Sequence, residues 1–326
     1  MQALQVRTLS DDLSGVTLVE TPLPQRQPRQ VLVRVRAASL NFPDLLMTRG
    51  HYQLKPPLPF VPGMDLSGEV VEADVDGPFA PGDAVVAATR LGAFADNALV
   101  DAASLSPKPE HLSFAEAASY GAAYLTAYVA LVELGGLKAG QWVLVHGASG
   151  GVGLAAVDLA KALGARVIAA SGSADKLALV ADTYAPDATL VSHGRFRDEI
   201  AAITGGALCD LVYDPVGGDV FDESTRCVAF GGKLLVVGFA GGRIADISTN
   251  IPLIKGFSVV GVRAGEYTRR FPERGVAIRA EVAALVAGGQ VKPRVDRVLP
   301  LSRWLEGFQA MARRELVGKV VFEPGS

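Results

Sequence analysis

The sequence predicts an α/β protein with two domains, a doubly wound parallel-sheet domain and a second domain that is mostly β. Three observations support this prediction. From Trp142 to Val262, strand patterns alternate with helix patterns, as in parallel sheets whose strands are joined by helices. Before residue 118, short strand patterns separated by turn signals are typical of a small barrel. The chain of 326 residues is too long for one ordinary core and suits two.

The alternating half begins with an apolar run, Trp142–Val145, which suits a strand buried on both faces. Further strands are predicted over residues 166–171, 188–192, 210–216, 233–239 and 257–262, and helices over 152–163, 174–184, 197–204 and 220–228. Because crossovers between parallel strands are right-handed, this pattern predicts essentially the doubly wound strand order. Its ligand crevice lies at the carboxyl ends of the strands.

The rest of the chain is assigned to the mostly β domain. Strands are predicted over residues 30–38, 68–75 and 83–88. Ser113 and Glu116 have the spacing of a capping box, which opens a helix that we expect to run to Val132. After Val262 the sequence predicts a helix over 276–287, a strand over 298–301, a helix over 302–314 and a strand over 318–322. This tail is too small to fold alone, so the predicted domains are residues 1–122 with 264–326, and residues 123–263.

A glycine-rich turn follows the first strand of the alternating half. Against the pattern G-x-G-x-x-G, the matching positions are Ala148, Gly150 and Gly153, so the first glycine is replaced. Such a turn lets backbone N–H groups approach a pyrophosphate, and the following helix adds partial positive charge. The expected contacts are Ser149, Gly150, Gly151 and Val152. The alternative is a tight turn without a ligand.

The end of the second strand indicates which dinucleotide this turn binds. NAD sites place a carboxylate there for the ribose 2′-hydroxyl. Here Ser171 and Gly172 end the strand and Lys176 follows, with no acidic residue at the strand end. Hydroxyl groups and a cation suit a 2′-phosphate, which favours NADPH, although Lys176 also fits a solvated position in a first helical turn.

The composition argues against several other classes of protein. The net charge is −3 and no basic block is present, so a nucleic-acid partner is not expected. No apolar run reaches membrane-spanning length, and the N-terminus lacks a signal core. With two cysteines, a disulfide framework is not expected, and a reducing cytoplasm is the predicted compartment. The four histidines show no metal-ligand spacing.

Several separated motifs occur in one order along nearly the whole chain. They are Ser39–Asp44, Arg49–Tyr52, Pro59–Gly63 with Asp65–Gly68, His146–Gly153, Asp214–Gly218, Val236–Phe239 and Gly318–Val321. On these motifs the chain resembles the zinc-independent quinone oxidoreductases of the medium-chain dehydrogenase/reductase superfamily. The resemblance implies a Rossmann domain, a catalytic domain like the GroES chaperonin, and hydride transfer from NADPH to a quinone or another α,β-unsaturated carbonyl.

The same resemblance bears on metal binding and on assembly. Zinc-dependent relatives carry a cysteine in the region of Leu40–Asn41 and a His-Glu pair at Met64–Asp65, so no zinc is expected here. Acceptors of hydride at a conjugated carbon need no Lewis acid when a hydrogen-bond donor stabilises the developing oxyanion. Relatives often pair the sixth strand across a two-fold axis, so residues 257–262 are the expected homodimer edge.

By resemblance, residues of both domains receive roles. The expected catalytic residues are Asn41, Tyr52 and Asp44. Besides those at the glycine turn and the second strand, the expected cofactor contacts are Asn41, Pro43, Thr126, His193, Gly238, Phe239, Val262, Arg263, Gly318 and Lys319. For three of these residues a structural role is the alternative: packing for Tyr52, loop ordering for Asp44 and a strand-edge lysine for Lys319.

Two other functions remain open from the sequence. Reduction of an enoyl thioester needs cations at the mouth of a longer groove, and the candidates are Arg263, Arg269, Arg270 and Arg274. The second alternative is a protein that binds NADPH without catalysis, because fold does not fix function.

Overall fold

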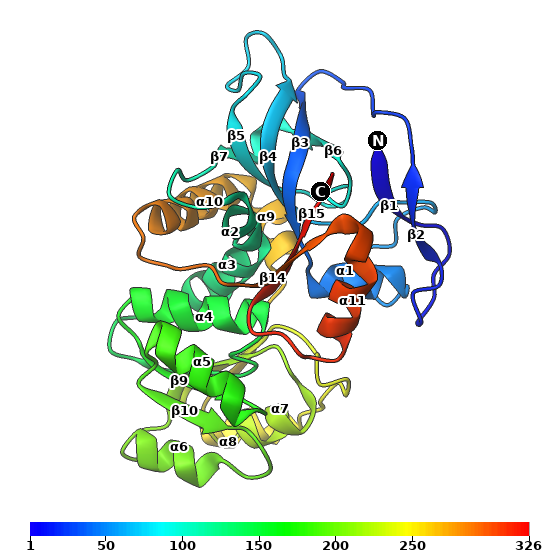
Figure 1. The fold of residues 1–326 in the computed structure, drawn as a ribbon. Helices are drawn as coiled ribbons and strands as arrows, with labels where there is room; N and C mark the ends of the chain where they lie inside the picture. Colours follow the sequence, from blue (N-terminus) through cyan, green and yellow to red (C-terminus); the bar gives the residue numbers. More distant parts are fainter. Residues whose placement is uncertain (326) are drawn as a thin grey trace. The chain divides into compact units, whose positions relative to one another are not determined.

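The computed structural model describes residues 1–325, and the chain divides into two compact units (Figure 1). Unit 1 consists of Met1–Ala122 and the segment that begins at Pro293, and unit 2 consists of Ala123–Lys292. Each unit is built around its own sheet, so each is described by itself.

Unit 2 contains a six-stranded sheet whose neighbouring strands are all parallel. In spatial order the strands are β10 (Ala188–Val191), β9 (Arg166–Ser171), β8 (Trp142–Val145), β11 (Cys209–Asp214), β12 (Val228–Val236) and β13 (Ser258–Gly261). This is the doubly wound order, and it confirms the predicted fold class. The order reverses between β8 and β11, and such switch points place ligands at the carboxyl ends of the strands.

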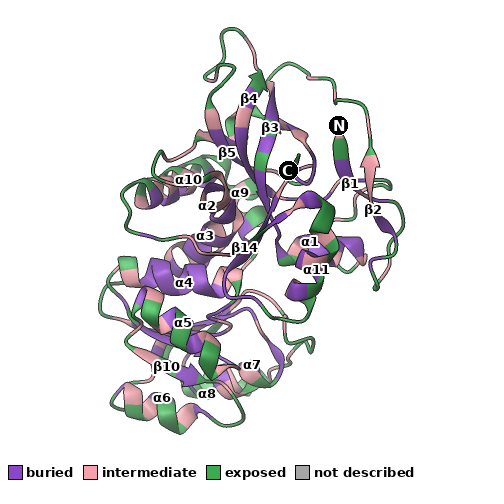
Figure 2. Ribbon diagram, in the orientation of Figure 1, coloured by how far each residue is buried: buried purple, intermediate pink, exposed green. Residues whose placement is uncertain are grey.

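Helices link these strands, and their apolar residues form the core of unit 2. They are α4 (Gly151–Ala162), α5 (Ala174–Tyr184), α6 (Arg197–Ile203), α7 (Gly218–Ser224) and α8 (Asn250–Lys255). Most of α4 is buried, as its purple ribbon in Figure 2 shows. Close packing at its first turn requires glycine, because a Cβ on Gly153 would lie 2.1 Å from the carbonyl oxygen of Gly147.

Unit 1 is organised around the long strand β3 (Gln30–Ser39). This strand pairs with β4 (Asp65–Glu72), β6 (Asn97–Asp101) and the C-terminal β15 (Lys319–Glu323), all antiparallel. The other elements of the unit are β1 (Gln2–Val6), β2 (Val16–Glu20), β5 (Ala84–Ala88), β7 (Leu105–Pro107), β14 (Val295–Pro300), α1 (Phe42–Thr48), α2 (Phe114–Ser119) and α11 (Trp304–Ala312). The rings of Phe94 and Phe322 meet edge to face, with centroids 5.3 Å apart, and so join the early and late segments in one core.

The chain returns to unit 1 later than the sequence analysis expects. Residues 264–292, assigned there to the first domain, lie in unit 2, where they form α9 (Ala264–Arg270) and α10 (Pro272–Ala287; orange in Figure 1). The reason is a polar network: Arg274 donates to Glu133 at 2.6 Å and to Glu281 at 2.7 Å, and the Tyr267 hydroxyl donates to Glu133.

Two other expectations are corrected. The helix expected from Ser113 to Val132 is three segments, α2, α3 (Gly121–Tyr128) and a π-helix over Val129–Leu134, because the chain interrupts its helical hydrogen bonds at Tyr120 and again at the π-helix. The helix expected over 220–228 ends at Ser224, and Val228 already opens β12.

The Arg274 network gives a first prediction. We expect Arg274→Met to speed amide hydrogen exchange across α9 and α10, because Glu133 and Glu281 lose the cation that joins them. Arg279→Met, on the same helix but outside the network, is the matched control. Equal exchange in the two variants would show that the network does not anchor these helices.

Candidate functional site

The glycine turn of unit 2 has the geometry of an anion site. Gly147 lies in the left-handed region with φ +57°, and its carbonyl accepts the N–H of Gly150 at 2.8 Å. Gly150 is the extended N-cap of α4, so the helix begins at Gly151. The first N–H groups of an α-helix have no intrahelical acceptor and lie at its positive end. The N–H groups of Gly151 and Val152 therefore lie at the positive end of α4, and their contact with a phosphate stays a prediction.

Hydroxyl groups gather at the carboxyl end of β9. Ser171 is the last residue of that strand, and its Oγ lies 3.3 Å from the Oγ of Ser149 in the glycine turn. His193, just after β10, donates from Nε2 to the carbonyl oxygen of Gly172 at 2.9 Å. The structure thus brings together four predicted cofactor contacts that are up to 44 positions apart.

Lys176 lies on the helix that follows. Ser173 is the N-cap of α5, and its Oγ accepts the backbone N–H of Lys176 at 3.4 Å. This cap places Lys176 in the first turn of α5, near the end of β9.

Four of the remaining predicted cofactor contacts of unit 2 lie after the end of β12 or β13. Val262 donates its N–H to Val236, and Phe239 packs over Gly217, where a Cβ would lie 3.0 Å from its ring. Gly238 precedes Phe239 after the end of β12, and Arg263 is the N-cap of α9. Thr126 instead lies on α3 and is half-buried.

The sequence analysis missed Asp214 as a member of this group. This buried residue ends β11, and its Oδ1 accepts the N–H groups of Val216 and Gly217 at 2.8 and 2.9 Å. It fixes the loop against which Phe239 packs. The Asp-Pro-x-Gly order of the loop is a turn signal that points to this role.

In unit 1, predicted residues from opposite ends of the chain meet in one buried polar cluster, which we call the Asn41 cluster: Asn41, Asp44, Asp65 and Lys319. The side-chain Oδ1 of Asn41 accepts Lys319 Nζ at 2.5 Å, and its Nδ2 donates to Asp65 Oδ2 at 3.0 Å. Asp44 accepts the N–H of Asn41 at 2.9 Å and that of Gly63 at 3.0 Å. Asp65 is a member that sequence reasoning missed.

Burial dominates the electrostatics of the Asn41 cluster. It raises the pKa of Asp44 to about 7, against the lowering effect of its two backbone hydrogen bonds and of Lys319. Burial also raises the pKa of Asp65 and lowers that of Lys319, while the two carboxylates act on Lys319 in the opposite direction. Lys319 and the two carboxylates therefore support one another's charged state, whereas Asp65 disfavours the ionisation of Asp44.

The contacts show the structural roles of these residues within unit 1. Both oxygens of Asp44 accept backbone N–H groups, as expected for a residue that orders its loop. Pro43 occupies the first turn of α1. Lys319 is not an edge lysine, because β15 lies between β14 and β3 and the side chain is buried. Gly318, with φ +101°, is the turn before it. Tyr52 packs partly buried against the core of unit 1.

The arrangement of possible metal ligands is described for residues 1–325. Within residues 1–325, no group of three or more His, Cys, Asp or Glu side chains is arranged to hold a metal ion. His146 is buried, its Nε2 lies 2.8 Å from Ser224 Oγ, and burial lowers its pKa to about 3. It is therefore a neutral residue of the core. No helix in the described part of the chain has the length and apolarity needed to span a membrane.

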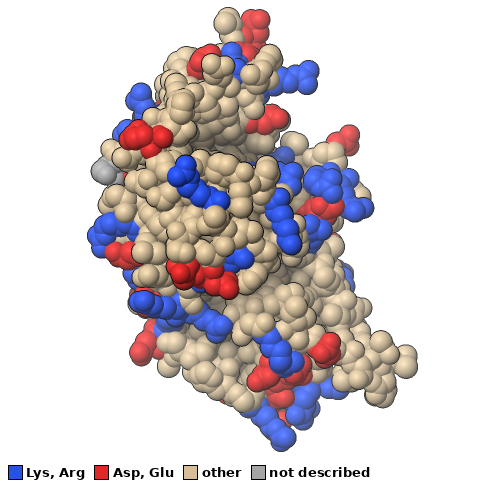
Figure 3. Space-filling model, turned by 90° about the vertical axis from the view of Figure 1, so that its right-hand side faces the viewer, with Lys and Arg blue, Asp and Glu red and all other residues tan. Residues whose placement is uncertain are grey.

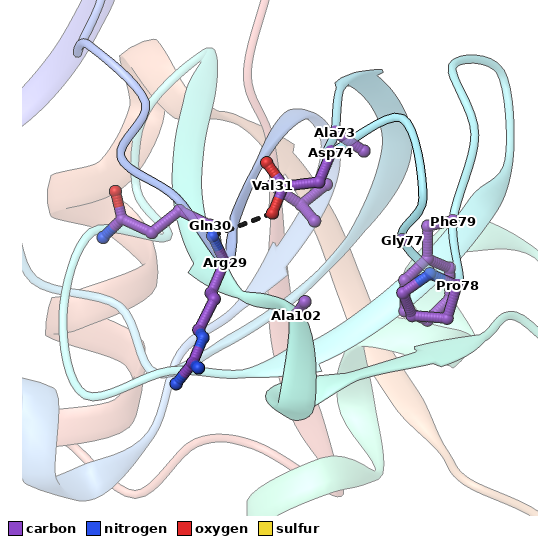
Figure 4. A pocket seen from close by; sticks show the side chains of 9 residues that line it. All are labelled: Arg29, Gln30, Val31, Ala73, Asp74, Gly77, Pro78, Phe79 and Ala102. Carbon is purple, nitrogen blue, oxygen red and sulfur yellow. Dashed lines mark hydrogen bonds between the residues drawn. The ribbon is translucent and has the colours of Figure 1, made fainter.

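A pocket in unit 1 lies apart from these groups. It is lined by Arg29, Gln30, Val31, Ala73, Asp74, Gly77, Pro78, Phe79 and Ala102, and Figure 4 shows the Arg29 N–H donating to Asp74. None of these residues belongs to the predicted site, and Asp74 is already bonded to Arg26.

Comparison with known proteins agrees with both units. A family model described as "Alcohol dehydrogenase GroES-like domain" matches residues 27–110, and one described as "Zinc-binding dehydrogenase" matches residues 151–279. The chain is 36% identical over 306 residues to quinone oxidoreductase-like protein 2 of Bos taurus, which covers 92% of this chain and 86% of the relative.

Two solved structures are similar over essentially their whole length. One, described as an NAD-dependent alcohol dehydrogenase, has a TM-score of 0.89 at 32% identity and covers 100% of both chains. The other, a mycobacterial protein solved with NADPH, has a TM-score of 0.90 at 29% identity and covers 99% of this chain and 100% of that one.

The Rossmann sheet, the GroES-like unit and the glycine turn define a medium-chain dehydrogenase/reductase. Within that superfamily, the chain belongs to the zinc-independent quinone oxidoreductase family.

The Asn41 cluster predicts a pH dependence of stability. The folded-state pKa of Asp44 is about 7, against an ordinary value of 3.8. Protonated Asp44 makes its full contribution to the free energy of unfolding below about pH 4. This contribution is lost as the pH rises through about 7. Relative to Asp44→Asn, the wild type should therefore lose free energy of unfolding between about pH 4 and pH 7.

This measurement needs a reporter within unit 1. In a Trp142→Phe background, Trp304 packs against the core of unit 1 and reports its denaturation in urea by fluorescence. Asp83→Asn, which removes an exposed carboxylate of the same unit, is the control. A pH-independent difference between the wild type and Asp44→Asn would contradict the assignment.

Proposed function

We propose that this protein is an NADPH-dependent oxidoreductase that reduces quinones or other α,β-unsaturated carbonyl compounds without a metal. The observation that supports it most directly is the hydroxyl cluster of Ser149 and Ser171 at an acid-free strand end, beside a glycine turn open to a pyrophosphate. Membership of the quinone oxidoreductase family supports the substrate class.

The choice of NADPH over NADH depends on the end of β9. A carboxylate at this position accepts the two ribose hydroxyls of NADH and repels a 2′-phosphate. Ser171 and His193 instead provide polar groups that are not carboxylates, and Lys176 provides a cation. The mycobacterial neighbour solved with NADPH agrees with this choice, whereas the neighbour described as NAD-dependent makes a direct comparison necessary.

The residues of this chain have separate tasks in the proposed reaction. When bound, NADPH supplies the hydride. Gly151 and Val152 hold its pyrophosphate by their N–H groups, and Phe239 and Val262 border the nicotinamide side. Tyr52 is the proposed hydrogen-bond and proton donor to the acceptor's carbonyl oxygen, where charge develops. Asn41, Pro43, Thr126, Gly238, Arg263, Gly318 and Lys319 are proposed as further contacts of the nicotinamide and its ribose.

The contacts of the arginines favour this proposal over an enoyl-thioester reductase. Arg269 and Arg270 both bond to Glu266, and Arg274 bonds to Glu133 and Glu281. Three of the four arginines are therefore already paired with carboxylates, and a phosphate of a thioester carrier must compete with these pairs. On the face drawn in Figure 3, basic and acidic side chains are likewise interspersed.

Buried free thiols at Cys209 and Cys227 suit a reducing cytoplasm.

The function is tested by following the oxidation of NADPH and of NADH with a quinone and with a small enone. We expect turnover with NADPH, and Lys176→Ala should raise the KM for NADPH about tenfold, because one charge-assisted hydrogen bond to phosphate is lost. The KM for NADH should not change.

The exposed Lys138, replaced by alanine, is the matched control for charge. NADPH binding without turnover on a broad panel of acceptors would favour a non-catalytic protein. An equal effect of Lys176→Ala on both coenzymes would refute the assigned role of Lys176.

We also propose that the protein is a homodimer formed through β13. This strand is the edge of the unit 2 sheet, and Val259 on it is exposed. Next to it, Phe230 packs over Gly256 but is 88% exposed, and Leu253 and Ile254 of α8 are 80% and 75% exposed. Apolar residues concentrated beside an open strand edge favour an interface.

The dimer is tested by size-exclusion chromatography with light scattering. Val259→Lys introduces a charge at the edge and should convert the dimer to a monomer at micromolar concentration, because two copies of the new charge face each other across a two-fold axis. Val75→Lys, at an exposed valine of unit 1, should leave the mass unchanged. An unaltered dimer in Val259→Lys would place the interface elsewhere.

A further inference from the structure

We infer that Asp65 is a positioning residue that fixes the side-chain amide of Asn41 so that Asn41 meets its ligand as a hydrogen-bond acceptor and not as a donor. The inference rests on the proposed function for the identity of the ligand. It concerns a residue to which neither the sequence motifs nor the comparisons assign a role.

The amide of Asn41 has little freedom. Its Nδ2 donates to Asp65 at 3.0 Å and to the carbonyl oxygen of Ser39 at 3.3 Å, which uses both of its hydrogens. Its Oδ1 accepts Lys319 Nζ at 2.5 Å. Both hydrogens of the amide are used, and its Oδ1, which also faces the backbone N–H of Asp44 in the capping box of α1, is the atom left to meet a further group. A donor is therefore the group that Asn41 accommodates, an N–H or O–H of the bound nucleotide or acceptor.

The two charged neighbours also determine which way the amide faces. Rotation of the amide by 180° would place its NH2 group against the ammonium of Lys319 and its oxygen against the carboxylate of Asp65. Both contacts would then be repulsive in a buried site where unpaired polar groups are costly. The opposite charges of Asp65 and Lys319 therefore fix one of the two amide orientations.

Asp65 is itself held in place by the start of α3. Its carboxylate accepts the N–H of Ala122 at 3.1 and 3.3 Å. A Cβ on Gly121 would lie 2.7 Å from Asp65 Oδ1, so the carboxylate occupies the space that a glycine leaves free. Burial raises the pKa of Tyr120 to about 12, and the charge of Asp65 adds to this shift. These contacts join β4, α1 and the start of α3 within unit 1.

A double-mutant cycle tests this role. Asp65→Asn keeps the shape but removes the charge, and we expect kcat/KM with a quinone to fall about tenfold, since small misplacements of a binding group are costly. In an Asn41→Ala background the same substitution should change kcat/KM less than about twofold, because Asp65 acts through Asn41. Equal losses in the two backgrounds would overturn the inference.

Two further variants separate positioning from a loss of stability. Gly121→Ala displaces the Asp65 carboxylate without changing a polar group, and it should reproduce the loss and its dependence on Asn41. Asp158→Asn is the matched control, because Asp158 is a buried carboxylate of unit 2 that also accepts one side-chain and one backbone donor. Its effect should be the same in both backgrounds.

A measurement independent of catalysis distinguishes this inference from the proposed function. The side-chain NH2 signals of Asn41 in a ¹⁵N NMR spectrum, assigned by their loss in Asn41→Ala, should exchange slowly in the wild type and faster in Asp65→Asn. Fast exchange in the wild type would overturn the inference even if NADPH is oxidised. Slow exchange without NADPH oxidation would retain the positioning and reject the function.

Discussion

The hydrogen bond from Lys319 to Asn41 joins residues 278 positions apart and completes the Asn41 cluster of unit 1. Lys319, Asp44 and Asp65 are buried together there, and removal of one partner from a buried charged pair typically costs about 3–5 kcal/mol because the opposite charge is left uncompensated. The cluster therefore exists only when β15 has taken its place between β14 and β3. The C-terminal strand completes the sheet and at the same time supplies the cation that the N-terminal loop needs.

Unit 2 uses a buried carboxylate in a comparable way. Asp158 on α4 accepts the hydroxyl of Tyr124 and the backbone N–H of Lys292, and the carbonyl of Lys292 accepts the hydroxyl of Tyr184. Tyr124 and Lys292 lie at the start and the end of unit 2. The helix α4, which begins at the glycine turn, therefore also holds the first and the last segments of unit 2 in place through Asp158.

The sequence predicts those features whose causes are local. The bounds of β9 and α5 agree with the structure to the residue, because a buried apolar run and an N-cap serine define them within a few positions. The Asn41 cluster was predicted only in part, since a lone aspartate at position 65 carries no signal for partners 24 and 57 positions away. The assignment of α10 to unit 2 was missed for the same reason. The sequence of its apolar face does not indicate which core the helix packs against, and Glu133 lies 141 positions from Arg274.

The occupancy of the Asn41 cluster constrains how an acceptor is activated. Asn41 Oδ1 already accepts a hydrogen bond from the Lys319 ammonium, and the charges of Asp65 and Asp44 act on it, so a dication there must enter beside an existing positive charge. The same saturation leaves Asn41 without an N–H for an oxyanion. In the proposed reaction, the donor for the developing charge therefore lies outside the cluster, at the Tyr52 phenol or at a water molecule. The buried network orders the loop and presents an acceptor, and it takes no part in proton delivery.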